Sequence, residues 1–258
     1  MNVKIGTSGY SFEDWRGTFY PQEIEKGKML DYYMKQFDTV EINSTYYGIP
    51  HPRVFDNMAR KAPPGFDFMV KVPQTFTHKR GELEKDRPRF LEALQPLVDS
   101  GRLAGLLAQF PYSFKFNPEN LDFVARCGGA VAPHQLFVEF RHNGWVNRPM
   151  YERLKAEGIG YVSVDEPALP GLLNPDCFAT TDTVYIRLHG RNAKEWWDGG
   201  ALRYDYTYSD GELESWQDKV RKIVAKVKKV YVYFNNCYQG QAVRDAARFA
   251  AMLRGMDG

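Results

Sequence analysis

The chain has 258 residues, of which 43% are hydrophobic and 15% are aromatic. This size and composition are typical of one barrel or two small domains, and they exclude a largely disordered chain. The formal net charge is only +2, so no global electrostatic field is available to hold nucleic acid or an anionic membrane.

The three cysteines, Cys127, Cys177 and Cys237, are odd in number and far apart. This usage is typical of a reducing compartment and excludes a cysteine-based zinc site of familiar spacing. No apolar run approaches the roughly 18 residues that a membrane helix needs. Residues 1–6 enter a strand without an apolar signal region. We therefore expect a cytoplasmic protein without a membrane partner, and no motif in the sequence indicates a cofactor.

Short apolar strands alternate with helical patterns along the chain. Strands are predicted at residues 3–6, 39–43, 67–72, 103–109, 136–141, 161–165, 183–189 and 231–235. Helices are predicted at residues 29–36, 53–61, 87–97, 118–126, 150–157, 210–227 and 242–253. This alternation predicts an α/β fold, a single (β/α)8 TIM-type barrel domain spanning residues 1–258. Residues 166–182 are rich in proline and have no helical pattern, so we expect an irregular sixth crossover.

The connections that lead from a strand to the next helix are often long, as at residues 7–26, 73–86 and 190–209. In barrels of this type these connections form the active face, and long ordered loops are usually functional. They contain a surplus of aromatic residues: Tyr10, Trp15, Tyr46, Trp145, Trp196, Trp197, Tyr204 and Tyr206. These rings either pack a lid over the barrel mouth or stack on a sugar, a base or another planar group.

Several motifs occur in one order from the first strand to the last. They include residues 6–10 (GTSGY), 40–46 (VEINSTY), 109–111 (QFP), 138–142 (VEFRH), 187–190 (RLHG) and 234–236 (FNN). With these motifs the chain resembles the YecE-like family, known as domain of unknown function 72, over essentially its whole length. The resemblance implies a TIM-type barrel, in agreement with the strand count, and it implies no particular reaction.

Strand alternation predicts which side chains point into the barrel. If Val40 and Ile42 pack against the helices, Glu41 and Asn43 face inward. The same rule gives an inward set near the strand ends: Lys71, Gln109, Glu139, Arg141, Ser163, Asp165, Arg187, His189, Tyr233 and Asn235. This set is either an internal ring of salt bridges or a preorganised site, and buried pairs are poor stabilisers relative to apolar packing. A site is therefore favoured.

The residue types suggest roles within such a site. Proton transfer is assigned to Glu139, His189, Asp165 and Glu41. Anion binding is assigned to Lys71, Arg141 and Arg187. Polar orientation is assigned to Asn43, Gln109, Asn235 and Asn236, and ring contacts to Tyr10, Trp15, Tyr46, Trp145 and Tyr206. We therefore expect an enzyme with hydrolase or lyase-type acid/base chemistry on a small or end-bound substrate that carries phosphate or carboxylate.

Two other functions remain open. The first is a protein that binds a small ligand, or less favourably nucleic acid, without turnover. The second is a metal-dependent hydrolase similar to barrel endonucleases that act at abasic DNA sites, with ligands drawn from Glu41, Glu139, Asp165 and His189. The cations interleaved with these groups disfavour a divalent metal, and no metal is predicted. The sequence does not indicate the oligomeric state.

Overall fold

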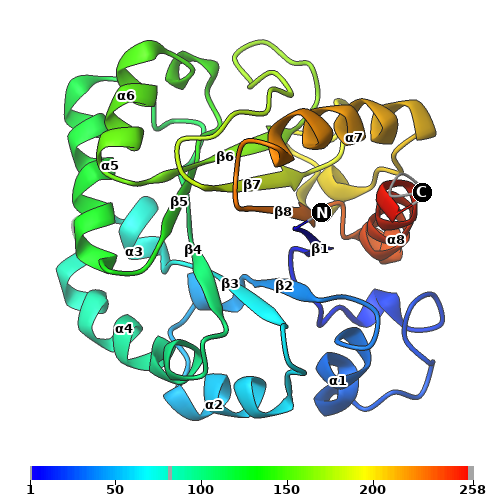
Figure 1. Cartoon of the computed structure of the whole chain (residues 1–258). Helices are drawn as coiled ribbons and strands as arrows, with labels where there is room; N and C mark the ends of the chain where they lie inside the picture. The colour runs from blue at the N-terminus through cyan, green and yellow to red at the C-terminus, as the bar shows by residue number, and fades with distance from the viewer. Residues whose placement is uncertain (1, 81–82, 255–258) are drawn as a thin grey trace.

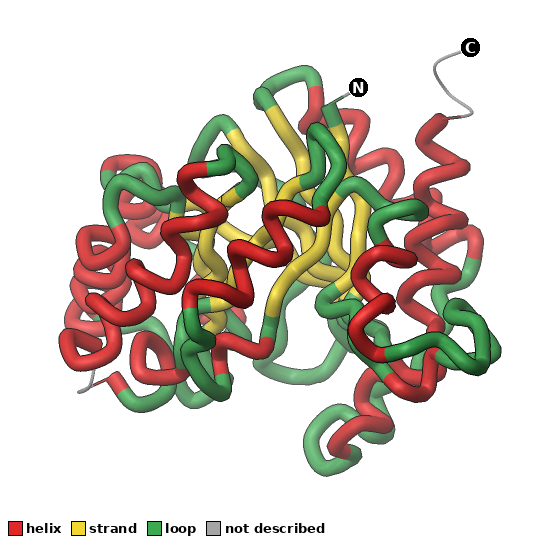
Figure 2. The backbone as a smooth tube through the Cα atoms, turned by 90° about the horizontal axis from the view of Figure 1, so that it is seen from below, coloured by secondary structure: helices red, strands yellow, loops and turns green. Residues whose placement is uncertain are grey.

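Eight parallel strands form a near-closed barrel with the helices outside it (Figures 1 and 2). The structure, a computed structural model, describes residues 2–80 and 83–254, so residues 1, 81–82 and 255–258 of the predicted domain lie outside the described part. The strands are β1 (Val3–Thr7), β2 (Thr39–Ile42), β3 (Asp67–Lys71), β4 (Leu103–Gln109), β5 (Leu136–Glu139), β6 (Gly160–Asp165), β7 (Thr183–Leu188) and β8 (Lys229–Phe234). All eight predicted strands are confirmed.

The α-helices are α1 (Met29–Tyr33), α2 (Pro52–Lys61), α3 (Gln74–Thr77), α4 (Leu83–Asp99), α5 (Pro118–Val131), α6 (Arg148–Ala156), α7 (Asp210–Val224) and α8 (Gln241–Arg254). Short 3₁₀ helices are η1 (Glu13–Trp15), η2 (Lys26–Lys28), η3 (Ser44–Tyr46), η5 (Asn143–Trp145), η6 (Gly200–Tyr204) and η7 (Tyr238–Gly240). No helix lies between β6 and β7, where residues 166–182 are all described. The irregular sixth crossover is therefore confirmed. Among the described residues, every helix is too short or too polar to cross a lipid bilayer.

Several helices begin where the sequence supplies a cap. The Asn117 side chain accepts a hydrogen bond from the Asn120 N–H at 2.7 Å, and Pro118 then starts α5. Before α7, Ser209 and Glu212 form a reciprocal capping box. These caps satisfy backbone donors that the first helical turn leaves unpaired. They fix the point at which each strand-to-helix loop ends.

The barrel closes between β1 and β2, and this seam differs from the other strand pairs. The order of hydrogen-bonded strands runs from β1 through β8 and β7 down to β2, and β1 meets β2 through one isolated bridge, Ser8 to Glu41. The Tyr33 hydroxyl spans the seam, because it accepts from the Thr7 N–H at 2.9 Å and donates to the Thr39 carbonyl at 3.1 Å. A Cβ at Gly6 would lie 2.2 Å from the same carbonyl oxygen, so only glycine permits this approach.

The N-terminal end of the barrel is filled by a charged cluster. The Asp67 carboxylate is contacted by Lys4 at 2.7 Å, Lys229 at 2.8 Å and the Tyr231 hydroxyl at 2.5 Å. Above this layer the rings of Phe137 and Tyr185 pack with centroids 5.3 Å apart. A cavity of about 660 Å³ lies at the opposite, C-terminal end of the strands.

Candidate functional site

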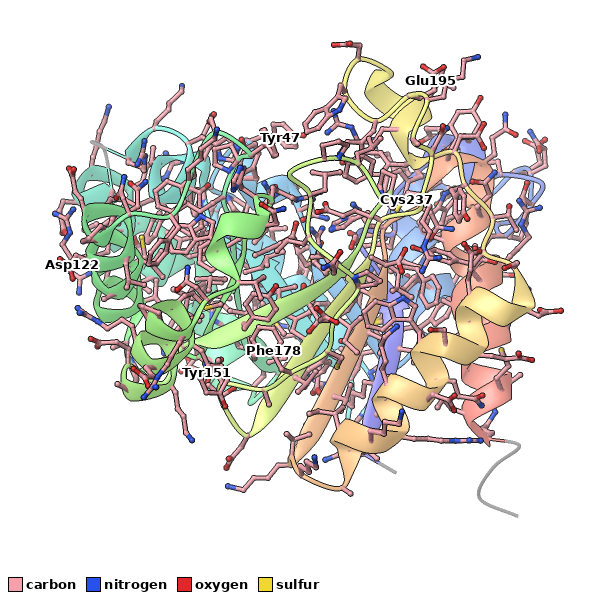
Figure 3. The ribbon with its side chains drawn as sticks, turned by 90° about the horizontal axis from the view of Figure 1, so that it is seen from above. Tyr47, Asp122, Tyr151, Phe178, Glu195 and Cys237 are labelled. Atoms are coloured by element: carbon pink, nitrogen blue, oxygen red, sulfur yellow. The ribbon has the colours of Figure 1, made fainter. Side chains whose placement is uncertain are left out.

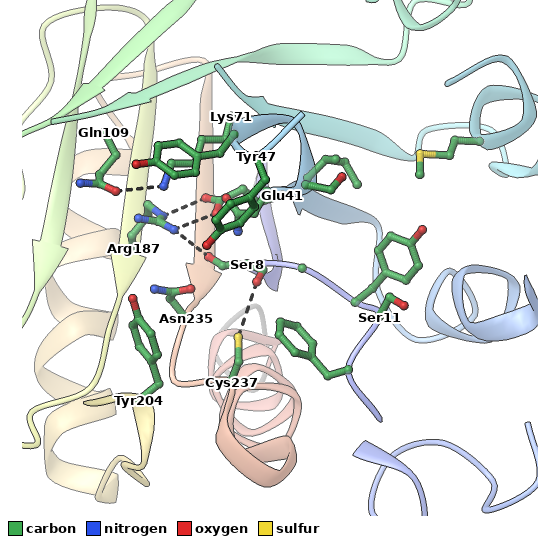
Figure 4. A pocket seen from close by; sticks show the side chains of 18 of the residues that line it. Ser8, Ser11, Glu41, Tyr47, Lys71, Gln109, Arg187, Tyr204, Asn235 and Cys237 are labelled. Atoms are coloured by element: carbon green, nitrogen blue, oxygen red, sulfur yellow. Dashed lines mark hydrogen bonds and ion pairs between the residues drawn. The ribbon is translucent and has the colours of Figure 1, made fainter. Parts of the chain in front are cut away.

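A cavity of about 660 Å³ opens at the C-terminal ends of the strands (Figure 4). Nine of the side chains assigned to the site from the sequence line it: Tyr10, Glu41, Asn43, Tyr46, Lys71, Gln109, Arg141, Arg187 and Asn235. They come from β1, β2, β3, β4, β5, β7 and β8 or from the residues that follow them. Strand alternation thus brings together residues that are far apart in sequence.

The floor of the cavity is an ion cluster built on Arg187. Its Nε and Nη2 donate to the two carboxylate oxygens of Glu41, each at 2.8 Å, and its Nη1 donates to Glu139 at 2.6 Å. The Tyr185 hydroxyl also donates to Glu41, and Ser8 lies 3.4 Å from Nη2. Because the guanidinium donors are used in this way, Arg187 serves to hold two carboxylates more readily than to bind a substrate anion.

Glu139 is the centre of the charge balance. Burial raises its pKa, but the guanidinium groups of Arg141 and Arg187 outweigh burial and hold the pKa of Glu139 well below its usual range. The Arg141 Nε lies 2.7 Å from Glu139 Oε1, in an ion pair whose angle is outside hydrogen-bond geometry. Glu139 is therefore a permanent anion at neutral pH.

Glu166 is a second carboxylate beside Arg141, and the sequence analysis missed it. Its Oε2 lies 3.3 Å from Arg141 Nη1, and its Oε1 accepts from the Leu173 N–H at 2.9 Å. Burial is the main reason that the pKa of Glu166 is raised to about 7. Glu166 therefore changes charge near neutral pH and alters how much of the Arg141 charge is available to the cavity.

Lys71 ends β3 and faces the cavity with little compensation for its charge. Its Nζ donates to Gln109 Oε1 at 2.9 Å and lies 4.5 Å from the centre of the Tyr46 ring. No carboxylate of the described residues lies within 4.0 Å of this amine. Burial, followed by the charge of Arg187, lowers the pKa of Lys71 to about 8. The amine is thus the cation in this cluster that is most available to a ligand.

His189 is fully buried beneath the cavity. Its Nδ1 shares a 2.8 Å hydrogen bond with the Asn235 amide nitrogen, so Nδ1 is the acceptor and Nε2 carries the proton. Nε2 lies 3.3 Å from Glu139. Burial and the charge of Arg141 lower the pKa of His189 to about 3. The imidazole is therefore neutral near pH 7, where the sequence analysis expected it to titrate.

Asp165 does not face the cavity, and its predicted inward direction is wrong. Its oxygens accept from Arg191 at 2.7 and 2.6 Å, from Tyr208 at 3.0 Å and from the Trp216 indole of α7. Both faces of β6 are buried, so the alternation of Val162 and Val164 with Ser163 and Asp165 does not distinguish the barrel interior from the side that the helices cover. The inward position belongs to Glu166, the next residue along the chain.

Four further residues assigned to the site lie outside the cavity. Trp15 is buried and donates to the Cys237 carbonyl at 2.7 Å. Trp145 donates to Phe114 at 2.6 Å. Tyr206 donates to Glu212 at 2.6 Å, and Asn236 donates to Asp245 at 2.8 Å. These side chains hold the loops against the outer layer. For the three aromatic residues this is the packing role that the sequence left open. Their expected contact with a ligand is not supported.

Ser8, Tyr47 and Cys237 also line the cavity, although the sequence did not lead us to assign them to the site. Tyr204, one of the aromatic residues of the long loops, lines it as well. The Tyr47 side chain is 81% exposed at the rim. Tyr47 and Glu195 lie toward the same edge of the molecule, on the side where the long loops gather (Figure 3). The sequence contains a signal for Tyr47, because it directly follows Tyr46, which was assigned to the site.

The four residues considered as metal ligands do not gather in one place. Asp165 is directed toward α7, while Glu41 and Glu139 are each held by Arg187. Within residues 2–80 and 83–254, no group of three His, Cys, Asp or Glu side chains has an arrangement that could hold a metal ion. The part of the chain that the structure describes therefore gives the metal-hydrolase alternative no donor set.

Comparison with known proteins agrees with this fold. The family model described as "Protein of unknown function DUF72" matches residues 4–257. The UPF0759 protein YunF of Bacillus subtilis (strain 168) is 31% identical over 269 residues, which cover 97% of this chain and 94% of that protein.

Solved structures give the same result. A DUF72 family protein from Thermotoga maritima MSB8 is 43% identical with a TM-score of 0.92, covering 98% of this chain and 100% of that one. A DUF72 family protein from Enterococcus faecalis V583 is 26% identical with a TM-score of 0.87, covering 98% and 95%. SacUVDE, at 11% identity and a TM-score of 0.53, shares the barrel fold. Sequence and structure together show that this chain belongs to the DUF72 family.

Proposed function

We propose that this protein is an enzyme that binds a small substrate carrying phosphate or carboxylate at the C-terminal mouth of the barrel. The observation that carries the proposal is Lys71, a cation that faces the cavity without a carboxylate of the described residues within 4.0 Å. A desolvated charge without a carboxylate in contact is costly, so an anionic ligand would supply a direct partner. A cavity of about 660 Å³ is of the size that small molecules occupy.

The charges around Lys71 support an anion in the same place. Glu41 and Glu139 offset Arg187 and Arg141, and Glu166 is partly protonated because its pKa is raised to about 7. The amides of Asn43, Gln109 and Asn235 line the cavity and add donors and acceptors to its wall. The mouth therefore has a positive excess that a phosphate or carboxylate neutralises.

The acid and base groups support turnover of such a substrate. Glu166 exchanges a proton near neutral pH and lies beside Arg141, while Glu139 stays charged. Two carboxylates whose pKa values are driven apart by their surroundings are typical of acid/base sites. We assign proton transfer to Glu166 and electrostatic support to Glu139 and Glu41, with hydrolase or lyase-type chemistry as the reaction class.

The proposal is tested by measuring how inorganic phosphate, pyruvate and sugar phosphates change the melting temperature. A ligand that prefers the folded protein raises the melting temperature of wild type. Lys71→Met is expected to reduce the affinity for such an anion by at least about tenfold, since a charge-assisted hydrogen bond contributes about 1.5–3 kcal/mol. The matched control is Lys194→Met, because the Lys194 side chain is 90% exposed. Equal ligand responses in Lys71→Met and wild type would contradict the proposal.

A second candidate is a binding protein for a longer ligand, including single-stranded nucleic acid, without turnover. The observation that favours it is exposure of two rings, Tyr47 at 81% and Trp197 at 46%, because exposed rings can stack on bases. Oligonucleotide affinity that falls steeply with salt, and that Tyr47→Ala and Trp197→Ala both weaken, would support it.

A further inference from the structure

The amine of Lys71 has the surroundings of a nucleophile as well as those of an anion-binding group. Resting on the proposed function, we infer that Lys71 forms a covalent imine with a carbonyl substrate that also carries an anionic group, such as a 2-oxo acid or an aldehyde phosphate. Arg141 would hold the anionic group. This assigns a substrate class and a covalent step to the cavity.

The position of the amine is fixed from one side and open on the other. Gln109 donates through its Nε2 to the Phe110 carbonyl at 2.7 Å, so its amide is oriented with Oε1 toward Lys71. Lys71 Nζ donates to that oxygen at 2.9 Å and lies over the Tyr46 ring at 4.5 Å. A nucleophile held at the end of a strand, with its remaining directions toward the cavity, can approach a bound carbonyl in a constant geometry.

The surroundings of the amine lower its pKa and so increase the neutral fraction. A carboxylate next to the amine would keep it protonated, and the described residues supply none within 4.0 Å. Burial and the charge of Arg187 lower the pKa of Lys71 to about 8, so roughly a tenth of the amine is neutral at pH 7. Desolvation and a neighbouring cation are the two ways in which proteins activate lysine for attack on carbonyl groups.

The step is balanced without an oxidant or a reductant. The nitrogen lone pair of neutral Lys71 attacks the carbonyl carbon and forms a C–N bond, giving a carbinolamine. The C–O bond then breaks, and the oxygen leaves as water with the two protons that the amine has lost. A C=N bond remains between Lys71 and the substrate, and this group can accept electrons from a neighbouring bond in lyase-type chemistry.

Reductive trapping tests the inference. The full chain is incubated with sodium cyanoborohydride and, separately, pyruvate, glyoxylate or pyridoxal 5′-phosphate, and its peptides are mapped by mass spectrometry. We expect a reduced adduct on the Lys71 peptide in wild type and in the control Lys194→Arg. Lys71→Arg keeps the charge but lacks the nucleophile, so it should lose this adduct while the anion still raises its melting temperature. The trapping rate should rise with pH with a midpoint near 8.

The outcomes separate the two proposals. No adduct on Lys71 with any of the three carbonyl probes overturns the imine, even if anions still bind through Lys71 and Arg141. Adducts spread evenly over exposed lysines, such as Lys194, also overturn it. An adduct on Lys71 without any binding of inorganic phosphate or unreactive carboxylates would overturn the anion site instead. If Lys71→Arg does not fold, the site of the wild-type adduct decides the question.

Discussion

At the scale of single residues, the neighbouring cations Arg187 and Lys71 have different roles at the mouth of the barrel. Arg187 donates to Glu41 and Glu139 through three nitrogens, so its charge is neutralised by two buried carboxylates. Lys71 makes one hydrogen bond to a neutral amide. Removing one partner from a buried ion pair leaves a stranded charge, so Arg187 is needed for the structure of the site. Lys71 is held at a cost in stability, and under the proposed function an anionic ligand would offset that cost.

Lys71→Met should therefore stabilise the protein at pH 7 by about 3 kcal/mol. The folded pKa of Lys71 is lowered to about 8 from 10.5, so the folded state carries the full penalty of the charge below pH 8. Between pH 8 and 10.5 the unfolded chain binds more protons, and the stability of wild type rises toward that of the variant. Urea unfolding of both proteins from pH 7 to 10.5 measures this difference. A difference that does not shrink with rising pH would show that lost contacts, and not the charge, decide the effect.

At the scale of elements, the seam between β1 and β2 is closed by side chains more than by backbone pairing. The Tyr33 hydroxyl of α1 joins Thr7 to Thr39 across it, and Gly6 leaves the space that the approach requires. The helix is short, but it carries the group that completes the barrel. Closure of the seam therefore depends on how the loop before α1 positions the Tyr33 hydroxyl.

Tyr33→Phe should lower the free energy of unfolding by about 1–3 kcal/mol, because it leaves a buried N–H and a buried carbonyl without their partner. Both groups lie in the strands of the seam, and Thr7 is fully buried. Urea unfolding monitored by circular dichroism gives the change. Tyr32→Phe is the matched control on the same helix, since the Tyr32 ring packs against Phe19 and Tyr20 on the outer side. A loss as large in the control would mean that the seam hydroxyl has no special role.

At the scale of the whole molecule, seven of the eight strands or the residues after them reach the cavity, and the irregular crossover after β6 completes its charge balance through Glu166. Glu166 links this crossover to Arg141, which follows β5, because its carboxylate lies beside Arg141 and accepts from Leu173 within the crossover. The overall charge of the mouth is therefore set by groups from distant parts of the chain. It also changes with pH.

Anion affinity should fall as pH rises through 7, and Glu166→Gln should remove that part of the fall. Glu166 has a pKa raised to about 7, so below that pH it is neutral and Arg141 is less compensated. Above it the carboxylate competes with the ligand for Arg141. Glutamine keeps an acceptor for Leu173 but cannot ionise. Titration of inorganic phosphate between pH 6 and 7.5 compares the two proteins, and identical pH profiles would refute the role of Glu166. The variant should also be more stable above pH 7, where the charged wild-type carboxylate is penalised.

The sequence predicted the barrel and much of the site because strand ends are marked chemically. Lys71, Gln109 and Arg141 each end or follow an apolar run, and the alternation of neighbours gives their direction. The prediction named the wrong residue at β6, because both faces of this strand are buried. Asp165 and Glu166 are equally good candidates for the inward position until the place of α7 is known. Loop aromatics such as Trp145 could not be sorted either, because packing beneath a loop and lining a cavity call for the same residue type.

The barrel seam and the cavity share residues, and this has a consequence for motion. Ser8 and Glu41 form the isolated bridge between β1 and β2, and both also line the cavity. A molecule bound there would contact both β1 and β2 and would link the two strands across the seam. Local breathing of the barrel and occupancy of its mouth should therefore oppose each other. Amides of β1 and β2 would then exchange with solvent more slowly when the mouth is filled, even at positions far from the ligand.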